Sequence, residues 1–155
     1  MRPGPAYRLA VCFALVACDL AACAPKSAPK GSALDNQIAA AVGDPSTCVL
    51  VADATTGKVV YQYGVAFNCD RALPACDQPG SLSARDALKF ATRPNGRLAS
   101  CPSSADGARN VGWAAGPVPS KTRKLIYSAV MEGERALPGH EMNARLYDAF
   151  VAAGM

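Results

Sequence analysis

Histidine is nearly absent from this sequence, and its scarcity excludes several kinds of site. His140 is the one histidine among the 155 residues. Zinc sites combine histidines with closely spaced cysteine pairs, and no two cysteines here stand in a C-x-x-C spacing. A Ser-His-Asp triad would have to use His140, which we interpret as a surface or packing residue at the start of the last helix. The sequence therefore predicts no metal site and no cofactor.

Residues 1–18 contain no acidic residue and no apolar run long enough to span a bilayer. Residues 9–17 are apolar throughout, but they fall well short of the roughly 20 residues that span a bilayer. They follow Arg2 and Arg8, and no acidic residue precedes them. A short apolar core behind positive charge is typical of an export signal peptide. The competing interpretation, a buried N-terminal helix, would have to carry Asp19 and run directly into a segment of Pro, Lys and Ser.

A cysteine motif follows the apolar run. Leu20-Ala-Ala-Cys23 resembles the lipobox of bacterial lipoproteins, in which the signal peptide is cut just before a cysteine that is then lipidated. This resemblance implies a signal peptide over residues 1–22, and the composition of residues 23–31 indicates a flexible tether. Leu15-Val-Ala-Cys18 fits the same pattern, so Cys18 is the alternative anchor.

The residue after the lipidated cysteine bears on the membrane that holds the anchor. In lipoproteins an aspartate there favours retention in the inner membrane, and Asp19 would follow Cys18. Ala24 follows Cys23 and permits transfer to the outer membrane. We therefore expect a lipid-anchored, periplasm-facing protein of the bacterial cell envelope, with the outer membrane favoured.

The cysteine count agrees with export. Of the seven cysteines, two would leave with the signal peptide and one would carry lipid. The four that remain are Cys48, Cys69, Cys76 and Cys101. An even number in an exported domain predicts two disulfides, with three possible pairings. We favour Cys69–Cys76, which closes a short loop, and Cys48–Cys101, which ties two distant segments.

Positive charge is only slightly in excess after processing. Removing Arg2, Arg8 and Asp19 from 16 basic and 12 acidic residues leaves 14 and 11. The one basic cluster, Lys-Thr-Arg-Lys at 121–124, is predicted to be a solvated hairpin tip, with contact to anionic lipid or nucleic acid as the minor alternative. We expect no nucleic-acid partner.

The first half of the remaining chain predicts a helix and a hairpin. Ser32 with Asp35 three places later predicts a capped helix that ends at Gly43. β-branched and aromatic residues then predict a hairpin over about 47–63. A loop rich in Cys and Pro is expected over 68–80.

The second half predicts a short helix, a loop, a second hairpin and a closing helix. A Ser-x-x-Asp pattern at Ser83 predicts a short capped helix. Residues 92–110 are predicted to form a loop with an extended piece at 98–101. A second hairpin is expected over about 111–131, and a helix with one apolar face after Pro138.

These elements predict one domain of the α+β class over residues 32–155. The two hairpins would form an antiparallel sheet, packed by the N- and C-terminal helices and stapled by disulfides. About 120 residues are enough for a single hydrophobic core.

The order of these elements is similar to the α/β domain of penicillin-recognising enzymes. Residues 49–61 resemble the opening hairpin of class D β-lactamases and penicillin-binding transpeptidases. Residues 73–76 resemble the segment that leads into the nucleophile helix of these enzymes, and residues 111–116 resemble the strand that follows their Lys-Thr-Gly motif. The resemblance covers about half of the mature chain. It implies binding of, or chemistry on, β-lactams or peptidoglycan peptides.

The motifs that would carry this chemistry depart from the family pattern. The family needs a serine followed three residues later by a lysine that takes its proton. Ser81 is followed at that spacing by Ala84, and Ser83 by Asp86. No Lys-Thr/Ser-Gly precedes Gly112. No catalytic residue is therefore carried over from the family.

We therefore expect a non-catalytic binding or interaction module, with peptidoglycan or an envelope protein as its partner. Candidate ligand contacts are Ser81, Ser83 and Trp113, although a tryptophan beside Gly112 in a strand is more typical of a core position. The alternative is a degenerate serine hydrolase that uses Ser81 or Ser83 as nucleophile. A structural envelope protein without a small ligand is the third hypothesis.

The mature N-terminus gives the first prediction. Mass spectrometry of the protein from the membrane fraction should find a lipidated Cys23 as the first residue. A first residue of Cys18 would move the protein to the inner membrane, and an unlipidated residue other than cysteine would contradict the lipoprotein interpretation.

Overall fold

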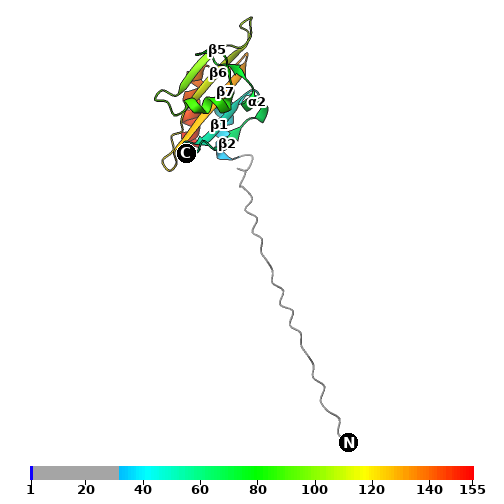
Figure 1. The fold of residues 1–155 in the computed structure, drawn as a ribbon, viewed down its shortest axis with the longest axis vertical. Coiled ribbons are helices and arrows are strands. Elements are labelled where there is room, and N and C mark those ends of the chain that lie inside the picture. Colours follow the sequence, from blue (N-terminus) through cyan, green and yellow to red (C-terminus); the bar gives the residue numbers. More distant parts are fainter. Residues whose placement is uncertain (2–31) are drawn as a thin grey trace.

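The structure is a computed structural model that describes Met1 and residues 32–155 (Figure 1). Cys18, Cys23 and the predicted tether lie outside the described residues. Within the described part, no helix has the length and hydropathy needed to span a membrane. The domain belongs to the α+β class, as predicted.

A five-stranded antiparallel sheet forms the centre of the domain, in the order β2-β1-β7-β6-β5. Its strands are β1 (Cys48–Asp53), β2 (Val59–Tyr63), β5 (Arg97–Pro102), β6 (Asn110–Pro117) and β7 (Leu125–Gly133). Both predicted hairpins are confirmed, because β1 pairs with β2 and β6 pairs with β7. The two hairpins join where β7 pairs with β1, from Cys48↔Val130 to Asp53↔Leu125.

The extended piece predicted at 98–101 is confirmed as part of strand β5, which is one residue longer at each end than predicted. It is a complete edge strand, paired with β6 from Arg97↔Ala115 to Pro102↔Asn110. The prolines and glycines around it indicate a loop when only local sequence is considered. Pairing with a neighbouring strand overrides that local preference.

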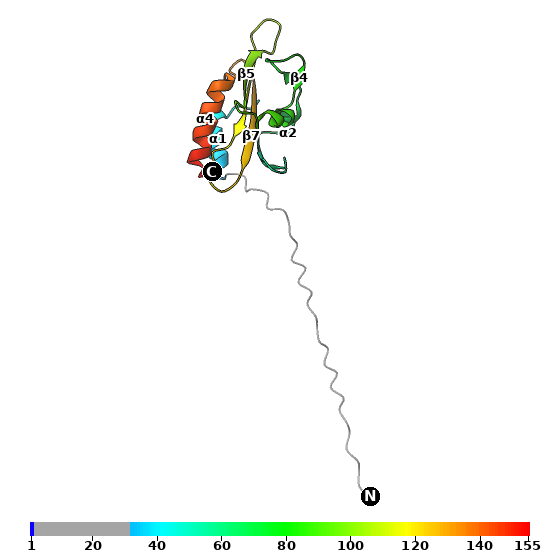
Figure 2. The same ribbon diagram turned by 60° about the vertical axis from the view of Figure 1, so that its left-hand side comes forward.

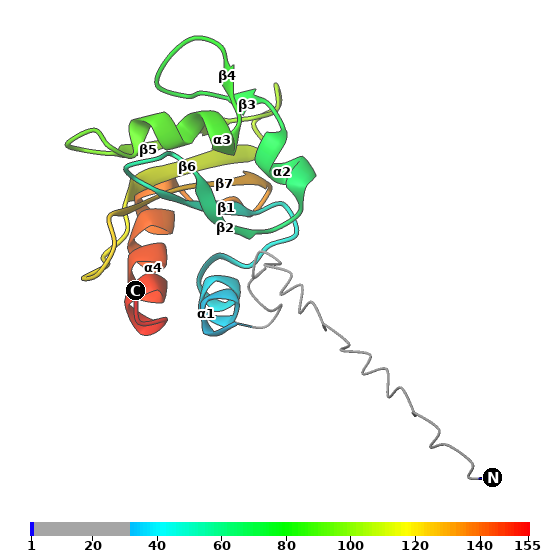
Figure 3. The same cartoon turned by 60° about the horizontal axis from the view of Figure 1, so that its bottom comes forward.

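Helices α1 (Ala33–Val42) and α4 (Gly139–Ala152) lie side by side and cover one face of the sheet (Figures 2 and 3). The predicted capping box of α1 is confirmed: the Ser32 hydroxyl accepts the N–H of Asp35 at 3.2 Å. The two helices bury their apolar faces against the sheet. The fully or nearly fully buried side chains are Ile38, Val42, Met142, Leu146 and Phe150.

A second layer of short elements covers the opposite face (Figure 2). It contains α2 (Ala66–Asp70), the ladder of β3 (Leu73–Pro74) with β4 (Ser81–Leu82), α3 (Ala84–Ala87) and the 3₁₀ turn η1 (Leu88–Phe90). The expected loop over 68–80 therefore holds part of α2 and all of β3. Elements of two to five residues are too short to show a hydrophobic period, so sequence periodicity misses them.

The disulfides join different partners from those we favoured. Cys48 is bonded to Cys69 and Cys76 to Cys101, with Cα–Cα distances of 5.2 and 5.4 Å. The strand order explains the correction. β1 and β5 are separated by β7 and β6, a distance of about 14 Å at ordinary strand spacing. A disulfide reaches only about 7 Å between Cα atoms, so Cys48 in β1 cannot bond Cys101 in β5.

The start of α4 approaches the sheet closely enough to require glycine at two positions. A Cβ on Gly112 of β6 would overlap the carbonyl oxygen of Leu137, and a Cβ on Gly139 would overlap that of Trp113. Backbone thus packs on backbone where α4 meets β6. This contact sets the position of α4 on the sheet.

Gly112→Ala tests this close approach, with Gly116→Ala on the same strand as its matched control. A Cβ on Gly116 would make only an ordinary contact, 3.6 Å from the Tyr127 ring. We expect Gly112→Ala to lower the free energy of unfolding by about 1–3 kcal/mol, as overpacking does. Gly116→Ala should change it by less than about 1 kcal/mol in the same denaturant titration. Equal losses would mean that the backbone contact of Gly112 can relax without cost.

Candidate functional site

Trp113, a candidate ligand contact, belongs to the core between the sheet and the second layer. Its side chain is completely buried. The indole N–H donates a hydrogen bond to the carbonyl of Pro74 at 2.8 Å. The core interpretation of Trp113 is therefore the one that the structure shows. Its polar edge holds residue 74 of the second layer instead of facing solvent.

Residues 74–77, which we call the covering segment, are held at every position by β5 or β6. Pro74 accepts from Trp113, and the carbonyl of Ala75 accepts from the guanidinium of Arg97. Cys76 is bonded to Cys101, and its φ of 68° lies in the left-handed region. The Asp77 carboxylate pairs with Arg97 at 2.5 Å. Four consecutive residues are thus fixed to two strands, which makes this segment the most strongly anchored part of the second layer.

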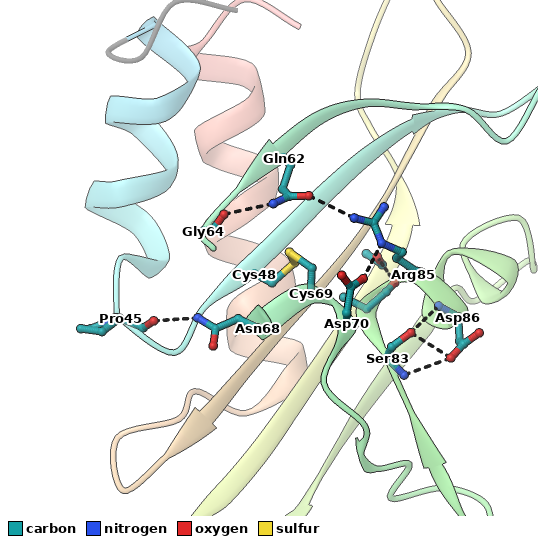
Figure 4. The surroundings of a disulfide bond; sticks show 12 residues. Pro45, Cys48, Gln62, Gly64, Asn68, Cys69, Asp70, Ser83, Arg85 and Asp86 are labelled. Carbon is teal, nitrogen blue, oxygen red and sulfur yellow. Dashed lines mark hydrogen bonds and ion pairs between the residues drawn. A yellow bond between two sulfur atoms is a disulfide. The ribbon is translucent and has the colours of Figure 1, made fainter. Parts of the chain in front are cut away.

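The Ser83 hydroxyl serves as a helix cap. It accepts the N–H of Asp86 at 3.1 Å and donates to the Asp86 carboxylate at 2.8 Å (Figure 4). Hydrogen bonds from Ser83 lower the pKa of Asp86, so this carboxylate is a weak base for removing a proton. The arrangement explains the predicted capping box of α3. It does not resemble an activated nucleophile.

Ser81 lies apart from this cap, in the short strand β4. It pairs across the ladder with Pro74, and the residue is exposed. Arg85 on α3 is occupied as well: it donates to Asp70 of α2 at 2.5 Å and to Gln62 of β2 at 3.3 Å (Figure 4). Ser81 is therefore the more accessible of the two candidate serines.

Two further polar residues lie at the ends of elements, His140 at the start of α4 and Asp53 at the end of β1. His140 is exposed in the first turn of α4. Asp53 accepts the N–H groups of Thr55 and Thr56 at 3.0 Å each, which lowers the pKa of its carboxyl. In residues 32–155, no group of three His, Cys, Asp or Glu side chains is placed to hold a metal ion.

Arg97 is the residue that sequence analysis misses. Its side chain is only 2% exposed, and its guanidinium lies 4.6 Å from the centre of the Phe90 ring. One terminal nitrogen, Nη2, makes both polar contacts with the covering segment. The other two nitrogens, Nε and Nη1, are buried without a hydrogen-bond partner. A basic residue in a short edge strand ordinarily points to solvent, so the sequence carries no sign of this burial.

Glu132 at the end of β7 forms a second buried charge cluster, and its carboxylate is fully paired. Arg109 donates to both carboxylate oxygens at 2.8 Å, Ser103 donates at 2.7 Å, and Arg71 lies 3.3 Å away. The hydrogen bonds from Arg109, together with those from Ser103, lower the pKa of Glu132 to about 2. This cluster ties the segment after α2 to β7 and to the β5–β6 turn. We interpret it as structural.

The lowered pKa of Glu132 predicts a pH-dependent contribution to stability. The ionised carboxylate is favoured in the folded state. Its contribution to the free energy of unfolding is therefore complete above about pH 4.5 and is lost as the pH falls toward 2. Glu132→Gln should lower the free energy of unfolding by about 2–3 kcal/mol at pH 7. The difference from the unmodified protein should shrink between pH 4.5 and 2 in denaturant titrations.

Glu141→Gln is the matched control for this experiment. Glu141 also pairs with an arginine, Arg145 at 2.5 Å, but both side chains are at least 40% exposed. Its loss should cost under about 1 kcal/mol. A Glu132→Gln variant as stable as the control at pH 7 would show that the buried pair contributes nothing net.

Comparison of the chain with protein-family models, with curated proteins and with solved structures finds no match in any of the three. The candidate site is therefore defined by its geometry: the covering segment, the buried Arg97 beneath it, and the serines on either side of Leu82.

Proposed function

We propose that this chain is an exported bacterial lipoprotein whose folded domain is a non-catalytic binding or interaction module of the cell envelope. In this proposal a lipid on Cys23 anchors the protein to the membrane, with Cys18 as the alternative anchor. The domain over residues 32–155 then faces the periplasm, where its partner is peptidoglycan or an envelope protein.

The observation that carries this proposal is the pairing of all four cysteines of the folded domain. Cys48–Cys69 ties α2 to β1, and Cys76–Cys101 ties the covering segment to β5. Disulfides form and persist in oxidising compartments and are rare in the cytosol. The two bonds therefore support export, which is what the N-terminal lipobox resemblance implies.

The environment of the candidate serines supports a binding role over catalysis. Ser83 is engaged as a cap of α3, and its carboxylate partner is a weak base. A serine nucleophile needs a neighbouring base that accepts its proton. The covering segment, which pairs with β4 at Ser81, makes structural contacts: a disulfide from Cys76 and an ion pair from Asp77 to the buried Arg97.

The alternative function is a degenerate serine hydrolase acting on β-lactams or peptidoglycan peptides. One observation favours it: Ser81 is exposed and pairs across the ladder with Pro74, the first residue of the covering segment. A relationship with penicillin-recognising enzymes is part of this alternative, and it rests on the sequence resemblance of residues 49–61, 73–76 and 111–116.

A fluorescent penicillin separates the two functions. We expect no covalent labelling of the full chain, because no activated serine is present in the arrangement around Ser81 and Ser83. Sedimentation with purified peptidoglycan tests the binding role in the same samples, and cross-linking to envelope proteins tests the other partner class.

Three serine variants make this test specific. Labelling that disappears in Ser81→Ala or Ser83→Ala would establish the hydrolase alternative. Ser46→Ala is the control, because Ser46 donates to Asp44 at 2.7 Å much as Ser83 donates to Asp86. Loss of labelling in all three variants would indicate non-specific reaction.

A further inference from the structure

The Arg97 guanidinium is buried with unused hydrogen-bonding capacity. Its side chain is 2% exposed, and Nε and Nη1 have no partner. A buried N–H without an acceptor has lost its hydrogen bond to water and gained none in exchange, which destabilises the fold. A guanidinium also stays charged under all ordinary conditions. The fold therefore maintains a costly, permanently positive group beneath the covering segment.

Positive charges outnumber carboxylates at this place: Asp77 pairs with Arg97, and Asp86 interacts electrostatically with Lys89. Lys89, Arg93 and Arg97 lie 5.4, 4.2 and 4.6 Å from the centre of the Phe90 ring. Within residues 32–155, Lys89 and Arg93 form no salt bridge, and Arg97 pairs with Asp77 alone. The surroundings of Phe90 therefore remain positively charged in the presence of Asp77.

The Asp77 carboxylate is far more accessible than its partner. It is 48% exposed, against 2% for Arg97. It opens the stretch Asp77–Ser81, which is exposed throughout and includes Gly80 at φ +96° with open space around its Cα. The Cys76–Cys101 bond holds the preceding residue on β5. The backbone of this stretch is held by hydrogen bonds from the Asp77 N–H to the carbonyl of Ala75 at 2.9 Å and from the Ala75 N–H to the carbonyl of Gly80 at 3.1 Å. Separation of Asp77 from Arg97 therefore requires only rotation of the exposed Asp77 side chain.

We propose that Arg97 is the anion-binding group of this domain and that Asp77 occupies it as an internal, displaceable ligand. The external ligand is a molecule with a free carboxylate, which takes the position of the Asp77 carboxylate on Nη2 of Arg97. Lys89 and Arg93 attract it to the site. This inference rests on the proposed binding function and names the chemistry of the ligand.

The experiment compares N-acetylglycine, a small carboxylate, with N-acetylglycinamide, its uncharged match. Binding to the full chain is followed by NMR through the indole N–H of Trp113, which donates to the covering segment next to Ala75. Asp77→Asn removes the internal competitor. We expect N-acetylglycine to bind this variant about tenfold more tightly than the unmodified protein, because the site is no longer occupied in advance. The amide should bind neither protein.

Asp70→Asn is the matched control. Asp70 is 54% exposed and pairs with an arginine at 2.5 Å, as Asp77 does, but its partner Arg85 is itself 46% exposed. This variant should bind N-acetylglycine no better than the unmodified protein. Equal gains in the two aspartate variants, or no gain in Asp77→Asn, would overturn the proposal and leave Arg97–Asp77 as a structural pair.

Arg97→Gln should lose the carboxylate binding gained by Asp77→Asn when the two changes are combined. Retention of that binding in the folded double variant would also overturn the proposal. If the double variant does not fold, the comparison of the two aspartate variants decides. Failure here is distinct from failure of the proposed function: binding to peptidoglycan or to an envelope protein that Arg97→Gln leaves intact would reject only the carboxylate site.

Discussion

Strand β7 pairs with β1 on one side and β6 on the other, and the rest of the described fold depends on this double pairing. Every residue of β7 from Leu125 to Glu132 is buried. Its alternating side chains serve both layers: Tyr127, Ala129 and Met131 belong to the cluster that includes α1 and α4, and Val130 to the cluster beneath the second layer. The strand therefore places two hairpins in one sheet and gives each layer a surface on which to pack.

The second layer lacks the means to fold without that sheet. Its helices have four or five residues, far fewer than an isolated helix needs. Links to the strands supply the missing stability: two disulfides, the hydrogen bond from Trp113 to Pro74, and the buried bond of 2.6 Å from the Ser128 hydroxyl to the carbonyl of Ala84. The geometry of the candidate site is thus set by residues on β1, β5, β6 and β7.

Sequence patterns predicted the parts of this fold that depend on local or periodic interactions. The capping boxes at Ser32 and Ser83 are side-chain contacts across three residues, and both are present. The hairpins and α4 follow from hydrophobic patterning. Disulfide partners depend on strand order, which no local pattern encodes, so the favoured pairing was wrong. For the same reason Cys69 lies over β1 and Cys76 over β5, although only six residues lie between them.

The candidate site could be predicted only in part, because burial of Arg97 depends on contacts between distant segments. Trp113 and the serines were found from the sequence, and they lie in or under the second layer. Arg97 is buried by Phe90 and by the covering segment, which are brought to it by η1 and by Cys76–Cys101. Before folding, nothing distinguishes it from Arg93, whose residue is exposed.

Three arginine–carboxylate pairs of this domain show why burial of the cation matters. In Arg109–Glu132 the anion is buried, and three side chains satisfy it. In Arg85–Asp70 both partners are about half exposed, so water can replace either. In Arg97–Asp77 the cation is buried and the anion is half exposed. A buried guanidinium cannot lose its proton and needs a counter-charge, whereas a half-exposed carboxylate that leaves the pair is solvated by water. In this pair the exchangeable partner is therefore the anion, and the part of the site that stays in place is the cation.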